Sequence, residues 1–239
     1  MKEMKILVLR KKRLLAVVLT LILCCLAGDG AYIAATVSPA GRFTVVIDAG
    51  HGGIDAGVVG KNGTKESDFN LTMAKELGER FSKAGFKVVY TRKNADGLYG
   101  KEKKDFKRKD MAARKKTIVD TDPDLVISVH ANKFPGDDRR GAQVFYDEMN
   151  KSGKDLAILT QERLNELNEK NVGRKFEALS GDYYVLKCTA KPSIIVECGF
   201  LSNADDEKLL NDAEYRSKLA EAIVFAATDY FALNGNNYA

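Results

Sequence analysis

The sequence predicts a single α/β domain with a mostly parallel, twisted sheet that helices cover on both faces. Short apolar runs alternate along the chain with longer segments whose apolar residues recur at helical spacing, which indicates a parallel sheet packed against helices. The chain has 239 residues, 45% of them hydrophobic and 30% charged, with four prolines. This composition is typical of a globular protein, and the length suits one domain preceded by a targeting segment.

The expected elements follow from the apolar pattern. The runs predicted as strands are residues 43–48, 86–91, 124–129, 142–146 and 193–196. The segments predicted as helices are residues 65–84, 106–119, 154–170, 205–211 and 214–231. The first helix places Leu71, Ala74 and Leu77 at helical spacing, and Gly85 ends it. In a sheet of this kind, binding sites form outside the carboxyl ends of the strands.

The amino terminus has the form of a secretory signal. A basic block, Arg10–Arg13, is followed by an apolar run from Leu14 to Gly28. This run is shorter than the roughly 20 residues that a membrane span usually needs, so cleavage and retention as an anchor both remain open. We expect residues 1–40 to be a signal peptide or membrane anchor with a short linker, and residues 41–239 to be the folded domain. The protein is then secreted or extracytoplasmic, tethered through residues 14–28 if the segment is retained.

The net charge of +5 belongs to the amino terminus. The first 13 residues carry six Lys or Arg side chains and one Glu, so the rest of the chain is neutral. A neutral body argues against a nucleic-acid partner, which needs a basic surface. One local exception runs from Lys101 to Lys116, with nine basic and three acidic residues. It is either a solvated loop and helix face or a patch that faces an anionic wall polymer or membrane.

Both histidines of the chain stand next to predicted strands. His51 follows the first strand, and His130 follows the third. In a parallel sheet, the ends of these strands reach the same edge. A single histidine there is usually a hydrogen-bonded polar residue. Two in equivalent places favour a metal site, because neutral imidazole is a common zinc ligand.

Two glutamates bring carboxylates to the same edge. Glu66 lies in the first turn of the first helix, where its alternative role is a favourable charge at the helix amino terminus. Glu197 follows the last apolar run, where its alternative role is an ion pair or a helix cap. His51, Glu66 and His130 with an open fourth position are typical of a catalytic zinc site. Glu197 would then take a proton from water and pass it to the leaving amine.

The glycine-rich segment 50–57 lies between a strand and a helix without matching the pattern of a phosphate-binding loop. Its glycines are expected to let the backbone turn tightly beside the metal. A nucleotide-binding function is therefore disfavoured.

Four blocks of sequence lie in order along the body of the chain. They are Val46–Gly57 (VIDAGHGGIDAG), Glu66–Ala74 with the pattern E-x-x-x-N-L-x-x-A, Arg114 followed by Asp124–Asn132 (DLVISVHAN), and Val196–Asn203 (VECGFLSN). Together with Thr91-Arg92, these blocks resemble the zinc-dependent N-acetylmuramoyl-L-alanine amidases. The resemblance covers residues 43–232, nearly the whole body.

The resemblance implies zinc on His51, Glu66 and His130, with Glu197 as the catalytic carboxylate. It also implies that residues 41–239 form an α/β zinc amidase domain, which hydrolyses the amide bond between the lactyl group of N-acetylmuramic acid and L-alanine in bacterial peptidoglycan. The domain arrangement resembles the sporulation and germination branch of the family, in which the amidase helps to make the muramic lactam of spore cortex. Whether an activating protein partner is needed stays open.

The alternative is a binding or regulatory module that keeps the fold without turnover, which the four intact residues disfavour. Ile118-Val119 stand where the family usually has Ala-Asn, which we interpret as a change in packing. Some members insert a long autoinhibitory helix after the second histidine, but the segment Lys133–Arg140 is too short for one. Cys188 and Cys198 would be able to pair outside the cell, although two cysteines do not define a disulfide framework.

Overall fold

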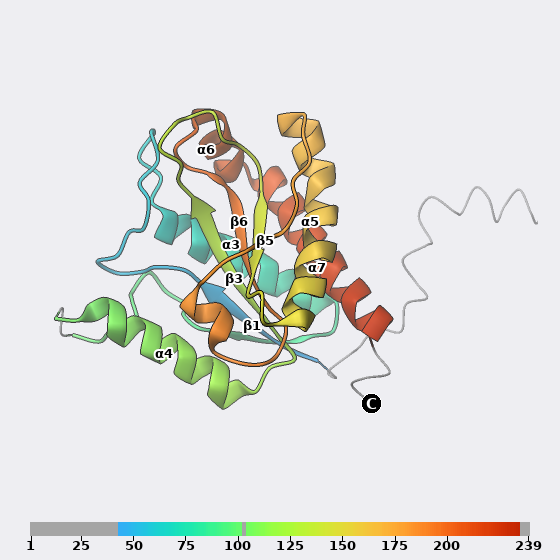
Figure 1. Ribbon diagram of the computed structural model, residues 1–239. Coiled ribbons are helices and arrows are strands. Elements are labelled where there is room, and N and C mark those ends of the chain that lie inside the picture. The colour runs from blue at the N-terminus through green and yellow to red at the C-terminus, as the bar shows by residue number, and fades with distance from the viewer. Residues whose placement is uncertain (1–42, 102–103, 235–239) are drawn as a thin grey trace, which may run out of the picture. The chain divides into compact units, whose positions relative to one another are not determined.

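The computed structural model describes residues 43–101 and 104–234, which fold around a six-stranded sheet in the order β2-β1-β3-β6-β4-β5 (Figure 1). The strands are β1 (Thr44–Ala49), β2 (Lys87–Tyr90), β3 (Leu125–Asn132), β4 (Gln143–Tyr146), β5 (Leu179–Ser180) and β6 (Ser193–Phe200). The helices are α3 (Glu66–Lys83), α4 (Phe106–Thr121), α5 (Lys151–Val172), α6 (Ala204–Asn211) and α7 (Ala213–Asn234), with a 3-10 turn, η1 (Tyr184–Lys187).

The sheet is mostly parallel, as the sequence predicts. β1 pairs in parallel with β2 and β3, β3 with β6, and β4 with β5, while β4 and β6 run antiparallel. The carboxyl ends of β1, β3 and β6 therefore lie at one edge of the sheet, where binding sites form in folds of this type.

Three long helices, α3, α5 and α7, cover one face of the sheet (Figure 1). Alternate strand residues, among them Ile47, Ile127 and Val196, point to this face and are fully buried beneath the helices. Helix α3 packs Leu77 and Phe81 into the same cluster. This apolar layer contains most of the buried hydrophobic side chains and forms the main core.

The opposite face carries a smaller apolar cluster beneath α4 and η1. Its buried members are Val46, Ile118, Val126, Val185, Leu186, Cys188 and Ile195. Helix α4 buries only Asp110, Arg114 and Ile118. These residues are four apart, so a single stripe of the helix faces the sheet. The predicted helix cover on both faces is confirmed, with a thicker layer on the main-core side.

Two strands are longer than the sequence predicts. β3 continues to Asn132 and β6 to Phe200, so His130 and Glu197 lie within strands rather than after them. The two residues pair with each other across the ladder, which keeps both strands extended past their apolar runs. The short β5 and η1 were not predicted, because neither has enough residues to show a period and β5 forms only by pairing with the distant β4.

Several smaller expectations can be compared with the structure. Cys188 and Cys198 are free thiols in the two different apolar clusters, so the sheet separates them and the suggested pairing is not formed. Segment 133–141 contains no helix, as its length predicts. The predicted signal or anchor and the domain boundary near residue 40 lie outside the described residues. Among the described helices, none combines the length and apolar character needed to cross a membrane.

Candidate functional site

Three side chains from separate elements meet at the carboxyl edge of the sheet. His51 lies in the loop after β1, Glu66 begins α3, and His130 lies near the end of β3. The Oε1 atom of Glu66 is 3.2 Å from Nε2 of His51 and 2.9 Å from Nδ1 of His130. One ligand atom from each residue lies within 4.8 Å of the others, a spacing that suits a single metal ion. The structure thus brings together the three residues that the sequence singles out as ligands.

Two glycines make this approach possible. A Cβ atom on Gly50 would lie 2.1 Å from Cε1 of His130, so only glycine leaves room for the ring. Gly57 has φ +63°, and a Cβ there would lie 2.4 Å from Oε2 of Glu66. The glycine-rich segment therefore serves both a tight turn, at Gly57, and close side-chain approach, at Gly50.

The backbone that carries His51 is held by two buried arginines. His51 has φ +60°, a left-handed conformation that costs a non-glycine residue about 1 kcal/mol or more. Arg92 donates to the carbonyls of Ala49 and Gly50 at 2.9 and 3.0 Å. Arg114 donates to those of Ala49 and His51 at 2.7 and 2.6 Å. All three carbonyls of the turn are thus bound by guanidinium groups, which stabilise the strained conformation.

Arg114 is itself held by buried carboxylates. It pairs with Asp48 at 2.6 Å and with Asp110 at 2.5 Å, and its side chain is only 2% exposed. Asp48 also accepts hydrogen bonds from Thr91 and Ser128 at 2.7 and 2.6 Å. Burial alone would raise the pKa of Asp48, but the charge of Arg114 and these hydrogen bonds outweigh it and lower the pKa to about 2. Asp48 is therefore a permanent anion beneath the site.

Asp55 orients the ring of His51 from the side away from Glu66. Its Oδ2 atom lies 3.0 Å from Nδ1 of His51, which is the arrangement that fixes ring orientation in carboxylate–histidine–metal units. Burial lowers the pKa of His51, but the hydrogen bonds and charges of Glu66 and Asp55 outweigh it and raise the pKa to about 9. A proton on His51 is therefore stabilised by the two carboxylates on either side of its ring.

Glu66 is fixed along its whole side chain. It is 3% exposed, and its Oε2 atom accepts a hydrogen bond from the backbone N–H of Val58 at 2.8 Å. Burial would raise the pKa of Glu66, but hydrogen bonds from His130 and His51 outweigh it and hold the pKa well below its usual range. Glu66 also lies in the first turn of α3, where its negative charge interacts favourably with the helix dipole. The same residue can therefore stabilise the helix and be a candidate metal ligand.

Glu197 faces the same side of the sheet as His130. The two are register partners on β6 and β3, and β4 places Gln143 opposite Glu197 on the other side. Within the described residues Glu197 forms no ion pair and caps no helix, and its Oε2 atom is buried without a hydrogen-bond partner. Neither alternative role considered for Glu197 is therefore found. Burial, aided by the charge of Glu66 and opposed by the histidines, raises its pKa to about 7.

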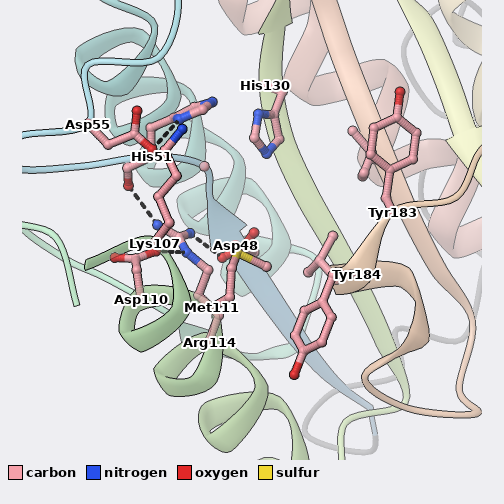
Figure 2. A pocket seen from close by; sticks show the side chains of 13 residues that line it. Asp48, His51, Asp55, Lys107, Asp110, Met111, Arg114, His130, Tyr183 and Tyr184 are labelled. Atoms are coloured by element: carbon pink, nitrogen blue, oxygen red, sulfur yellow. Dashed lines mark hydrogen bonds and ion pairs between the residues drawn. The ribbon is translucent and has the colours of Figure 1, made fainter. Parts of the chain in front are cut away.

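A cavity of about 270 Å³ opens beside His51 and His130. Figure 2 shows that α4 forms one wall and the segment with Tyr183 and Tyr184 the other. Lys107, Met111 and Ile195 also line this cavity. Sequence reasoning missed the two tyrosines, because they lie in a segment too short to show a period. The only feature of the sequence that could have placed them near the site is their position shortly before the predicted strand 193–196.

Comparison with known proteins fits this architecture. The model of the family described as N-acetylmuramoyl-L-alanine amidase matches residues 45–229. The germination-specific N-acetylmuramoyl-L-alanine amidase of Bacillus subtilis is 31% identical over 80% of this chain and 81% of its own length. The amidase LytC of the same organism is 32% identical over 79% of this chain but only 35% of its own length.

Solved structures agree. The CwlD amidase of Clostridioides difficile, solved in complex with the GerS lipoprotein, has a TM-score of 0.75 and 34% identity. It matches 80% of this chain and 99% of its own. An N-acetylmuramoyl-L-alanine amidase from Clostridium difficile 630 has a TM-score of 0.69 and 28% identity, over 80% of this chain and 97% of its own.

The helix-covered sheet, with a His-Glu-His group at its carboxyl edge, places the protein in the α/β class and gives it a candidate metal site. The chain belongs to the N-acetylmuramoyl-L-alanine amidase family, whose model spans most of its length. It is an amidase that acts on peptidoglycan. The α/β fold that the sequence resemblance implied is also confirmed.

Proposed function

We propose that this amidase is zinc-dependent and hydrolyses the bond between the lactyl group of N-acetylmuramic acid and L-alanine. The observation that carries the proposal is the convergence of His51, Glu66 and His130 within 4.8 Å, beside the buried Glu197, whose Oε2 atom has no hydrogen-bond partner among the described residues. Two imidazoles and one carboxylate are a common donor set of catalytic zinc sites, which keep a fourth position open. The residues present therefore fit the metal that the family resemblance implies.

His51, Glu66 and His130 would hold the zinc ion. The ion would supply Lewis-acid polarisation of the amide carbonyl and activation of a water molecule. The chain's own residues supply the rest. Asp55 keeps the ring of His51 in place, and the carbonyl contacts of Arg92 and Arg114 hold the turn that presents it.

Glu197 would carry the proton. Its buried Oε2 atom has no hydrogen-bond partner in the part of the chain that the structure describes, and its pKa of about 7 lies near neutral pH. A carboxyl group with a pKa near the working pH can accept a proton from the attacking water and later donate it to the leaving amine. Glu197 lies beside His130 in the sheet register, which supports its placement at the reacting bond.

The test measures metal content and turnover on the same samples. Zinc-loaded full-length protein should release peptide from muramyl peptides. Glu197→Gln should keep one zinc per chain and lose at least about a hundredfold in kcat, the contribution typical of acid–base catalysis. His51→Ala should lose zinc as well. Glu221→Gln, an exposed glutamate on α7, is the matched control. Full activity of Glu197→Gln would contradict the assigned role.

We further propose that the enzyme works outside the cytoplasm, on spore cortex. The support is its 31% identity to a relative named a germination-specific amidase, together with the signal-like amino terminus. Mass spectrometry of the products from purified vegetative wall and from cortex, with and without a chelator, checks this. Chelator-sensitive products from cortex in preference to wall are expected, and an exclusive preference for vegetative wall would contradict the cortex role.

A protein partner and a membrane tether complete the proposal. The CwlD amidase was solved with a lipoprotein bound, which supports a partner for this chain, and residues 14–28 would supply the tether. Zinc affinity and turnover should therefore be higher for protein isolated in its native membrane fraction than for the purified chain. Equal values would argue against an activating partner, and recovery of all activity in the soluble fraction would argue against the tether.

A further inference from the structure

The two walls of the cavity beside the candidate metal site differ in chemistry, because one presents a lysine and the other presents aromatic rings. The α4 wall presents Lys107 and Met111, and the opposite wall presents Tyr183 and Tyr184 (Figure 2). The floor between them includes the apolar side chain of Ile195. One end of the cavity is bounded by His51 and His130, so a ligand lying in it would extend away from the metal site along α4.

The α4 wall carries two lysines on the same side of the helix. Lys107, Met111 and Lys115 are four residues apart, so they lie along one side of the helix. Lys107 lines the cavity, and Nζ of Lys115 lies 6.0 Å from the ring centroid of Tyr184 at its far end. Neither lysine forms an ion pair with any residue that the structure describes. In contrast, Lys116 is paired with Asp120 on the same helix.

The acids near these two lysines are already engaged. Asp110 is paired with Arg114, and Asp55 is paired with His51. Lys107 and Lys115 therefore present positive charge that no ion pair with a described residue neutralises. An anionic ligand is the chemistry that such a wall favours.

The tyrosine wall is partly exposed, and its Tyr183 ring is packed against neighbouring residues. Tyr183 is 37% exposed and Tyr184 51%. The ring of Tyr183 packs edge-on against Phe145 at 5.5 Å between centroids, and a Cβ atom on Gly181 would lie 2.3 Å from it. A ring held in this way offers apolar contact area at a low cost in conformational entropy, which suits the aliphatic parts of a ligand.

We propose that Lys107 and Lys115, facing Tyr183 and Tyr184 across the cleft, bind the acidic peptide stem of the substrate. This inference rests on the proposed amidase function, because it places the scissile bond at the metal end of the cleft. Lys107 pairs with the free carboxylate of the second stem residue, next to the L-alanine at the cut bond. Lys115 pairs with a carboxylate at the carboxyl end of the stem.

The helix spacing agrees with this arrangement. Eight residues separate the two lysines, which is about 12 Å along an α-helix. An extended peptide covers that length in roughly three to four residues. This matches the distance from the second residue of a stem pentapeptide to its end.

The experiment compares two soluble muramyl pentapeptides that differ only at the second residue, which carries either a free α-carboxylate or an α-amide. Zinc-loaded full-length protein should have a KM about fivefold lower for the free acid. Lys107→Gln should remove this difference by raising the KM for the free acid, with kcat unchanged, and Lys107→Arg should restore it. Lys116→Gln, the paired lysine of the same helix, is the control and should change neither value.

Lys115 is tested at the other end of the stem. Lys115→Gln should raise KM about fivefold for a pentapeptide with a free carboxyl terminus but not for its carboxyl-terminal amide. Calorimetric binding of the released stem peptides, free acid or amidated, gives a readout that needs no turnover. Equal affinity of the wild-type protein for both peptides would overturn the subsite. Cleavage of neither muramyl peptide would instead contradict the amidase proposal, so the two failures are distinguishable.

Discussion

The face of the sheet under α3, α5 and α7 is built mainly from apolar side chains, whereas the face under α4 and η1 adds the buried charges of Asp48, Asp110 and Arg114 to a small apolar cluster. Burial on the first face stabilises the fold in proportion to the apolar area removed from water. On the second face, each charge must keep its partner. Alternate residues of the same strands point to opposite faces of the sheet. The face under α3, α5 and α7 therefore stabilises the fold, and the face under α4 and η1 carries the candidate site.

Breaking the ion pairs of the polar face should have the largest effect. Arg114→Met leaves Asp48 and Asp110 buried without their partner and is expected to lower the free energy of unfolding by about 3–5 kcal/mol. Urea denaturation measures it. Arg108→Met, which removes an exposed arginine of the same helix, should stay within about 0.5 kcal/mol. A loss below about 1 kcal/mol for Arg114→Met would show that the pairs do not support the fold.

A cavity in the apolar face should cost stability without affecting the site. Leu77 on α3 is fully buried, and Leu77→Ala is expected to lower the free energy of unfolding by about 2–5 kcal/mol. Zinc affinity, measured by competition with a chelating dye, should not change. The control is Leu233→Ala, since Leu233 is 73% exposed. A large fall in zinc affinity for Leu77→Ala would show that the two faces are not independent.

Acid should weaken the polar face in a defined pH window. The pKa of Asp48 is lowered from its ordinary value of 3.8 to about 2, so its ionised form stabilises the folded state. That stabilisation, about 2 kcal/mol, is fully present above the unfolded value and is lost as the pH falls from 3.8 through 2. Urea denaturation at several pH values should show this slope. Asp48→Asn should make this slope shallower, whereas Asp120→Asn, which removes an exposed acid of α4, should leave it unchanged.

The smallest expected effect on folding concerns Asp55, which orients the candidate metal ligand His51. Asp55→Asn keeps the shape of the side chain that contacts Nδ1 of His51 but removes its charge. We expect zinc affinity to fall about tenfold to a hundredfold, with little change in the free energy of unfolding. Asp68→Asn, an exposed acid in the first turn of α3, is the control. Unchanged affinity would mean that the histidine is held by its backbone contacts alone.

Much of the architecture was predictable because apolar periodicity directly reports burial. The main helices and the first three strands lie within a few residues of their predicted bounds. The candidate ligands were also predictable, since His51 and His130 sit at strand ends that a parallel sheet brings together. The ion pair of Arg114 with Asp48 was not, because 66 residues separate the partners and no local pattern encodes their contact. The tyrosine wall was missed because Tyr183 and the four-residue turn η1 form a segment too short to show a period.

The hydrogen bonds from Arg114 to the turn that carries His51 also have a consequence for evolution. A single substitution at Asp48, Asp110 or Arg114 removes a partner from a group of buried charges, so each one-step change is unfavourable. Across related sequences, the residues at these three positions should therefore be substituted together or not at all. We expect substitutions at these positions to be correlated among the amidases, even in lineages whose surfaces have diverged widely.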